Sequence, residues 1–173
     1  MIELRPFAKL GGADHGWLKA KHHFSFASHY DPDNMGHGAL RVWNDDEIAP
    51  NTGFPAHPHA NMEIITYVRE GAITHQDSLG NKGRTEAGDV QVMSAGSGIR
   101  HSEYNLEPTK TRIFQIWIEP TARGGTTDLG LEAVPQGGPL RQARHHRKWF
   151  RRRCGRAADP RGRAGARHHA EGR

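Results

Sequence analysis

Two short motifs place histidine and glutamate side chains at a spacing that suits metal binding. His57 and His59 are separated by one residue, and the same spacing joins His101 to Glu103 further along the chain. On an extended strand, residues i and i+2 project from the same face. Two such pairs on neighbouring strands would direct three imidazoles and one carboxylate at a common point, a donor set that suits Fe(II), Mn(II), Ni(II), Cu(II) or Zn(II). The spacing therefore predicts a metal site made of these four side chains.

A fifth candidate is Glu63, which is in phase with His57 and His59 if the strand continues without interruption. The alternative interpretation is a buried partner that orients a histidine by a hydrogen bond. Six other histidines lack a paired spacing and are interpreted as surface or ordinary structural residues: His15, His22, His23, His29, His37 and His75. Four more lie near the C-terminus, where metal binding would have no catalytic meaning: His145, His146, His168 and His169.

The segments that must position these side chains are typical of β-strands. The chain contains 21 Gly and 10 Pro, and the residues between them follow period two better than period 3.6. Strands are predicted over residues 38–43, 62–68, 72–75, 90–93 and 112–118. We expect the first of these to end in an acidic turn over Asn44 to Asp46. Gly96 and Gly98 predict a tight turn just before His101. The pattern favours an all-β body built as a sandwich or barrel.

Charge is divided unevenly along the chain, whose net charge is +5. Residues 1–133 hold 12 Lys and Arg against 17 Asp and Glu, whereas residues 134–173 hold 12 against 2. This composition predicts three parts: a domain over 1–120, a Gly/Pro-rich linker over 121–140 and an Arg-rich tail over 141–173.

The tail has few large apolar side chains, so we expect it to be disordered, because burial cannot offset the entropy cost of ordering it. Two interpretations stay open. In the first, the tail is a nucleic-acid-binding arm, because arginines alternate with aromatic residues. In the second, it is out-of-frame sequence, and the excess of 11 Arg over 1 Lys favours this interpretation. We expect no nucleic-acid partner despite the basic charge.

Composition also excludes several classes of protein. Cys154 is the only cysteine, so neither a disulfide framework nor a Cys-rich zinc motif is expected. The N-terminus lacks the apolar core of a signal peptide, and no apolar run approaches the roughly 18 residues of a membrane span. A soluble, cytoplasmic protein without a membrane partner is expected.

The motifs together resemble the pirin branch of the cupin superfamily. The resemblance spans residues 2–120 and depends on these segments: His22-His23-Phe24-Ser25-Phe26, Phe54-Pro55-Ala56-His57-Pro58-His59, Tyr67-Val68-Arg69-Glu70-Gly71, Gly88-Asp89-Val90-Gln91 and Ser94 to Glu103. It implies a cupin-type β-barrel, that is, a double-stranded β-helix of the jelly-roll kind. It also implies one divalent metal ion, usually Fe(II), with Ni, Cu, Mn or Zn as alternatives. The matching ligand positions are His57, His59, His101 and Glu103, while Glu63 would orient a ligand.

The resemblance also implies a function. Bacterial pirin-like proteins are associated with quercetin 2,3-dioxygenase activity, so the expected substrates are a flavonol and dioxygen, with Glu103 acting as base as well as ligand. Pirin-like proteins carry two cupin domains, and the second would begin soon after Pro120, where this chain changes character. We therefore expect either a homodimer through the face that the second domain would cover or poor solubility. Two alternative functions remain: a non-enzymatic, redox-responsive iron-binding regulator and an inactive single-cupin fragment.

Overall fold

The computed structural model describes residues 4–132, and its regular structure is almost entirely β-strand. Within this part of the chain, one short 3-10 helix, η1 (Phe7–Lys9), is followed by eleven strands. The strands are β1 (Gly11–Asp14), β2 (Leu18–His22), β3 (Leu40–Ile48), β4 (Thr52–His59), β5 (Glu63–Glu70), β6 (Ala72–Asp77), β7 (Lys82–Glu86), β8 (Val90–Ser94), β9 (Ile99–Asn105), β10 (Thr111–Ile118) and β11 (Asp128–Glu132). No helix among the described residues is long and apolar enough to cross a membrane.

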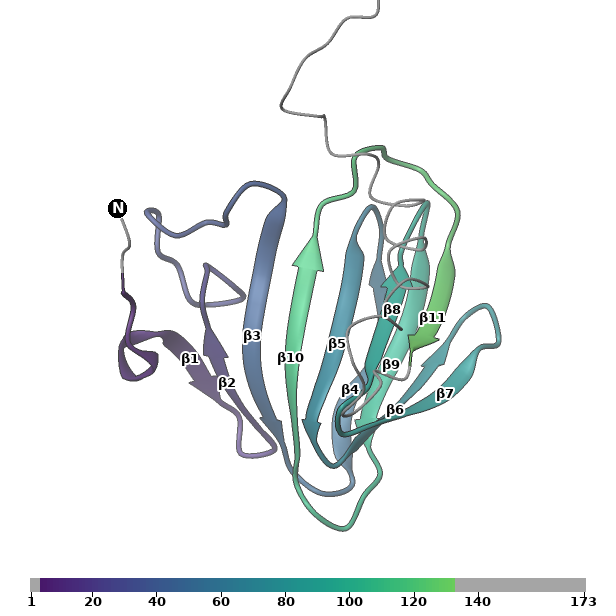
Figure 1. The fold of residues 1–173 in the computed structure, drawn as a ribbon, viewed down its shortest axis with the longest axis horizontal. Coiled ribbons are helices and arrows are strands. Elements are labelled where there is room, and N and C mark those ends of the chain that lie inside the picture. Colours follow the sequence, from purple (N-terminus) through teal and green to yellow (C-terminus); the bar gives the residue numbers. More distant parts are fainter. Residues whose placement is uncertain (1–3, 133–173) are drawn as a thin grey trace, which may run out of the picture. The chain divides into compact units, whose positions relative to one another are not determined.

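The strands form two antiparallel sheets (Figure 1). One sheet has seven strands in the order β1-β2-β3-β10-β5-β8-β11, and the other has four in the order β4-β9-β6-β7. The inner faces of the two sheets meet: Glu103 of β9 accepts hydrogen bonds from Thr66 of β5 and Gln115 of β10. The expected all-β, cupin-type fold is confirmed.

Strand β5 illustrates how sequence periodicity builds the interior. Ile64, Thr66 and Val68 are buried, while the residues between them are half-buried. Apolar side chains on this pleat and its neighbours form two core clusters. One contains Leu18, Ala20, Ile48, Val68, Ile73 and Ile113, and the other contains Ile64, Met93, Ala95 and Ile99. Burial of alternate residues therefore fixes which face of each strand points inward.

Most of the predicted strands are confirmed, but the acidic turn is wrong. Asn44 and Asp46 lie inside β3, which pairs with β2 on one side and β10 on the other. Asparagine and aspartate are uncommon in strands. Here the two flanking strands supply backbone hydrogen bonds on both edges of β3, and this pairing outweighs the local preference of these residues for a turn.

The segment expected to be a linker contributes a strand. Residues 128–132 form β11, which pairs with β8 from Asp128↔Ser94 to Glu132↔Val90. The β-structure therefore continues past residue 120, because β8 offers an edge to which the chain returns. The remainder of the expected linker, from residue 133, and the Arg-rich tail over 141–173 lie outside the described residues.

Candidate metal centre

An irregularity in β4 decides where its histidines point. Phe54 pairs with Glu103 of β9, whereas His57 pairs with His101, so three steps along β4 match two along β9. One extra residue is therefore accommodated as a β-bulge. Because side chains alternate between faces, the bulge returns His57 to the face of Phe54, and His59 follows two residues later. All three side chains line one cavity.

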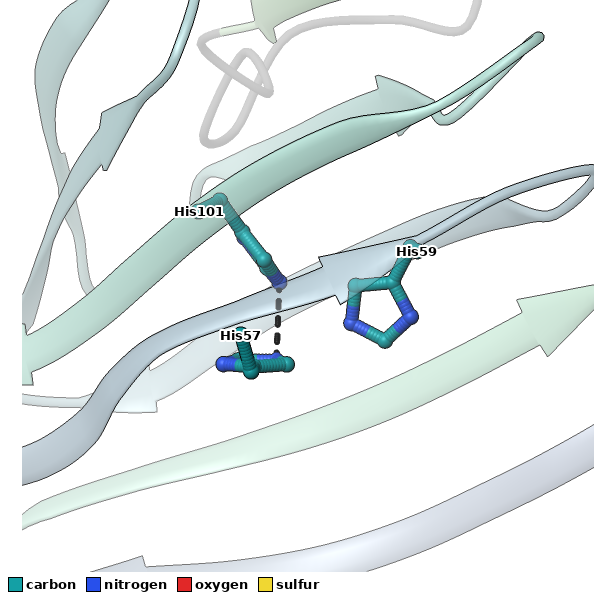
Figure 2. Close-up of side chains that lie close together, drawn as sticks. All are labelled: His57, His59 and His101. Atoms are coloured by element: carbon teal, nitrogen blue, oxygen red, sulfur yellow. Dashed lines mark hydrogen bonds between the residues drawn. The ribbon is translucent and has the colours of Figure 1, made fainter.

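Three imidazoles converge at this point of the interior (Figure 2). His57 and His59 come from β4 and His101 from β9. Their ring centroids are 4.5 Å apart for His57 and His101, 4.8 Å for His57 and His59, and 4.9 Å for His59 and His101. Gly96 makes the turn before β9 with a φ of 46°, and a Cβ there would lie 2.3 Å from the carbonyl oxygen of Gly125. The predicted tight glycine turn is thus confirmed.

The protonation of these rings suits metal binding. His57 Nδ1 lies 2.7 Å from the backbone oxygen of Pro55. A carbonyl oxygen can only accept, so Nδ1 donates this hydrogen bond, and Nε2 is the ring nitrogen that faces the cluster. Burial, followed by the neighbouring imidazoles, lowers the pKa of His59 to about 4 and that of His101 to about 3. Both rings are therefore neutral near pH 7, which is the form that binds metals.

The donor geometry fits a single divalent ion. The Nε2 atoms of His57 and His101 are 3.1 Å apart, and two nitrogens bound at about 2.1 Å in adjacent octahedral positions would be about 3.0 Å apart. The Nε2 atom of His59 is buried and has no hydrogen-bond partner among the described residues. An unpartnered buried nitrogen beside two others calls for a ligand that accepts a lone pair.

Glu103 lies beside this cluster but faces the opposite sheet. Its side chain is 1% exposed. Oε1 accepts hydrogen bonds of 2.8 Å from Thr66 Oγ1 and from Gln91 Nε2, and Oε2 accepts one of 2.7 Å from Gln115 Nε2. One carboxylate oxygen of Glu103 lies within 4.8 Å of ring nitrogens of both His101 and His75. His57, His59 and His101 form a separate group of this kind, which does not include Glu103. The four predicted residues are therefore neighbours, but only the three imidazoles form one cluster.

The donors to Glu103 belong to a polar row on the inner face of the seven-stranded sheet. Its members stand in register across β8, β5, β10, β3 and β2: Gln91, Thr66, Gln115, Asn44 and His22. His22 Nδ1 donates to Asn44 Oδ1 at 3.0 Å, and burial lowers the pKa of His22. This polar row holds the Glu103 carboxylate at one end and lines the cavity at the other.

His75 is the site residue that the sequence interpretation missed. Its side chain is fully buried, its ring centroid lies 5.3 Å from that of His101, and its Nε2 lies 3.3 Å from Asp77 Oδ2. The signal was present in the sequence, because His75 and Asp77 repeat the spacing of His101 and Glu103. The interpretation of His75 as a surface histidine is therefore wrong, because the ring is buried beside His101.

Glu63 does not lie on the strand of His57 and His59. That strand ends at His59, and Glu63 begins β5 in the other sheet. Its Oε2 accepts a hydrogen bond of 2.6 Å from Ser94 Oγ. The uninterrupted strand assumed for Glu63 is thus wrong, because residues 60–62 carry the chain from one sheet to the other.

The three imidazoles open onto a cavity of about 300 Å³ between the sheets. Its apolar walls include Leu18, Phe54, Ile64 and Trp117. Trp117 and His59 pack in a T-shaped arrangement, with ring centroids 4.9 Å apart and an interplanar angle of 82°. The volume lies at the lower end of the range of about 300 to 1,000 Å³ found for small-molecule sites.

A second carboxylic acid, Asp46, lines the same cavity from β3. It is 2% exposed, and Oδ1 has no hydrogen-bond partner within residues 4–132. Burial first, and then the neighbouring Asp45 and Glu103 carboxylates, raise the pKa of Asp46 to about 7. The cavity therefore holds one fully hydrogen-bonded carboxylate and one that lacks a partner.

The fold, the histidine cluster and the motifs around them can be compared with known proteins. The family model for Pirin matches residues 3–118, well over half of the chain. The chain belongs to the pirin family. The resemblance noted in the sequence is therefore confirmed over the segment that contains every candidate ligand.

Curated pirin relatives are similar at high identity. A pirin-like protein of Caulobacter vibrioides is 79% identical over 137 residues, which is 79% of this chain and 59% of the relative. The quercetin 2,3-dioxygenase of Escherichia coli K12 is 56% identical over 127 residues, 73% of this chain and 55% of the relative. The chain thus spans somewhat over half the length of these relatives.

Solved structures share the fold. Bacterial pirin YhhW from Escherichia coli in complex with nickel(II) is 51% identical, with a TM-score of 0.77 over 80% of this chain and 60% of that one. GK1651 from Geobacillus kaustophilus aligns with a TM-score of 0.60 at 23% identity, covering 75% of this chain and 51% of the other, which supports the fold alone.

Proposed function

We propose that this pirin-family chain forms the metal-binding domain of a flavonol dioxygenase of the quercetin 2,3-dioxygenase type. The observation that carries the proposal is the cluster of three imidazoles at the wall of a largely apolar cavity. The relative from Escherichia coli K12 is named quercetin 2,3-dioxygenase. A substrate class with flat aromatic rings suits such a cavity.

One divalent ion would be held by His57, His59, His101 and Glu103. Fe(II) is the metal we propose, and nickel is the alternative suggested by the YhhW complex. When bound, the ion supplies Lewis acidity toward a hydroxyl group of the substrate and the capacity to exchange electrons. The hydrogen bond from His57 Nδ1 to Pro55 fixes the ring so that Nε2 faces the other donors.

The apolar walls bind and orient the flavonol. Phe54, Ile64 and Trp117 remove the aromatic rings from water, and this desolvation provides most of the binding free energy. A flat substrate lying against Trp117 would present one edge to the histidine cluster, because Trp117 packs against His59. Excluding water also protects the reacting edge from side reactions.

Glu103 is the proposed general base. It would accept the proton of the flavonol 3-hydroxyl at a carboxylate oxygen, after which the flavonolate reacts with dioxygen and the ring opens with release of carbon monoxide. Thr66, Gln91 and Gln115 stabilise the carboxylate and fix its direction by three hydrogen bonds. These hydrogen bonds offset the cost of burying a carboxylate at 1% exposure.

The proposal is tested by metal analysis of the purified chain together with a quercetin assay. In His101→Ala, metal affinity should fall by about 100-fold or more, and quercetin consumption should fall with it. His37→Ala is the matched control, because His37 is exposed and distant from the cluster in sequence; it should keep both. Equal metal content in wild type and His101→Ala would rule out the proposed centre.

A further inference from the structure

Asp46 stands among apolar residues on the inner face of the seven-stranded sheet. It pairs with Ala20 of β2 on one side and with Ile113 of β10 on the other, and Ile113 pairs in turn with Val68 of β5. This apolar row, made of Val68, Ile113, Asp46 and Ala20, lies one pleat away from the polar row. The surroundings that the fold gives Asp46 are therefore those of a core residue.

The charged neighbours of Asp46 do not offset its burial. Two of the groups that act on it, Asp45 and Glu103, are themselves acidic. The cation that acts on it, Arg69, is engaged on the outer face, where it forms an ion pair with Asp45 and stacks over Phe114 at 4.2 Å. Asp46 Oδ1 is left without a hydrogen-bond partner in the described part of the chain.

A buried carboxyl without a partner destabilises a fold, and leucine or asparagine would fit the same strand at lower cost. The side chain of Asp46 also faces the cavity rather than the packed core. An unpaired buried polar group that borders a cavity is a candidate for a hydrogen bond with a ligand. With a pKa raised to about 7, the group can either donate or accept near neutral pH.

We propose that Asp46 is a specificity-determining residue that hydrogen-bonds a phenolic hydroxyl of the substrate on the wall opposite the histidine cluster. The assignment rests on the proposed flavonol dioxygenase function. The histidines come from β4 and β9 of one sheet and Asp46 from β3 of the other, so one ligand could reach both across the cavity. The site then selects flavonols that carry a hydroxyl in addition to the one at position 3.

The selection follows from the hydrogen bond to Asp46 that a flavonol without further hydroxyl groups could not make. A flavonol with only its 3-hydroxyl would fill the apolar walls but would seal Asp46 away from water with no partner. Sites built to hydrogen-bond a hydroxyl discriminate strongly against analogues that lack it. Leu18 and Phe54, which border the same space, offer no polar atom. Asn44 and Gln115 also line the cavity, but their side chains bond to His22 and Glu103.

Paired ligands and paired variants test the assignment. Quercetin is compared with 3-hydroxyflavone, which has the 3-hydroxyl alone, by quenching of tryptophan fluorescence, since Trp117 lines the cavity. The metal-loaded proteins are wild type, Asp46→Leu, Asp46→Asn and Asp45→Asn. The last removes the same charge from the outer face of the same strand, where Asp45 meets Arg69.

Wild type should bind quercetin about 10- to 100-fold more tightly than 3-hydroxyflavone. Asp46→Leu should reduce this ratio to within about threefold by weakening quercetin alone, Asp46→Asn should keep most of it, and Asp45→Asn should keep all of it. An unchanged ratio in Asp46→Leu, equal weakening of both ligands, or no preference in wild type would overturn the assignment.

Turnover measured on the same samples separates this inference from the proposed function. A binding preference that depends on Asp46, without oxygen uptake or loss of quercetin, would refute the dioxygenase and leave the Asp46 subsite standing. Turnover with a ratio that Asp46→Leu does not change would refute the subsite alone. Failure of wild type to bind either flavonol below millimolar concentration would overturn both.

Discussion

Two buried carboxylic acids face the same cavity from opposite sheets, and their surroundings differ. Glu103 on β9 is 1% exposed and accepts three hydrogen bonds from side chains of the polar row. Asp46 on β3 is 2% exposed, and its Oδ1 has no partner among the described residues. Two equally buried carboxyl groups therefore differ in the hydrogen bonds that the surrounding side chains give them.

The difference comes from a shift of two residues along neighbouring strands. Thr66 and Gln115 belong to the polar row, and the residues two positions along β5 and β10, Val68 and Ile113, belong to the apolar row. A carboxylate opposite the first row is stabilised, whereas one within the second is destabilised. The polar row supplies hydrogen bonds to Glu103, whereas the apolar row leaves Asp46 Oδ1 without one among the described residues.

Replacing a carboxyl by an amide at Glu103 should have the largest effect. In Glu103→Gln, the amide nitrogen would face donors from Thr66, Gln91 or Gln115, and the base would be lost. We expect quercetin turnover to fall by about 100- to 10,000-fold at equal metal loading. Steady-state kinetics on metal-quantified protein measure this.

Asp45→Asn is the control for that experiment, because it makes the same chemical change on the outer face of β3. Its turnover should stay close to that of wild type. If Glu103→Gln consumes quercetin as fast as wild type, Glu103 has no role as a base and the two carboxyls differ only in stability.

The same replacement at Asp46 should stabilise the protein in a pH-dependent way. The carboxyl ionises at 3.8 when unperturbed and at about 7 in the folded chain. Between these values the folded state binds more protons than the unfolded state, so the free energy of unfolding of wild type falls as pH rises. Asparagine does not titrate, and Asp46→Asn should gain from about zero at pH 4 to roughly 2 to 4 kcal/mol at pH 8.

Urea unfolding of both proteins at several pH values measures this difference. Asp45→Asn is again the matched variant. It should lose stability because the ion pair with Arg69 is broken, and its gain with pH should be much smaller than that of Asp46→Asn, because burial outweighs Asp45 in raising the pKa of Asp46. A constant difference between Asp46→Asn and wild type from pH 4 to pH 8 would show that Asp46 finds a partner in the folded chain.

Removing one donor to Glu103 should have the smallest effect. Thr66→Val keeps the shape of the side chain but deletes the hydroxyl that donates to Oε1, and we expect a loss of about 1 to 2 kcal/mol in the free energy of unfolding. Thr85→Val is the control, since the buried Thr85 hydroxyl has no partner in residues 4–132. Equal losses in the two variants would mean that the Thr66 hydrogen bond contributes nothing.

The histidine cluster was predictable because period two is a local property of strands. The spacing of His57 and His59, and that of His101 and Glu103, was sufficient to predict two strands with inward-facing pairs. The convergence of the two pairs also needs β4 and β9 to be neighbours, which the resemblance to pirins implies and the structure confirms. Local spacing and one strand pairing therefore account for the convergence of the three imidazoles.

The other polar groups of the site could not be predicted in the same way. Asn44 and Asp46 have the composition of a turn, and only their pairing with β2 and β10 makes them part of a strand. The register that aligns Asn44 with Gln115 joins residues 71 positions apart. His75 reaches the site because β6 pairs with β9, as His75↔Glu103 shows. Such contacts depend on strand order, which single-residue preferences do not encode.

The bulge in β4 has a consequence for how the chain can change in length. The extra residue between Phe54 and His57 returns both β4 imidazoles to the inner face, and it brings the Pro55 carbonyl to the His57 ring. Deleting Ala56 would reverse the alternation for every later residue of the strand and turn His57 and His59 outward together. Replacing Ala56, which is exposed, would leave the alternation unchanged. At this position the centre tolerates variation in residue type but not insertion or deletion.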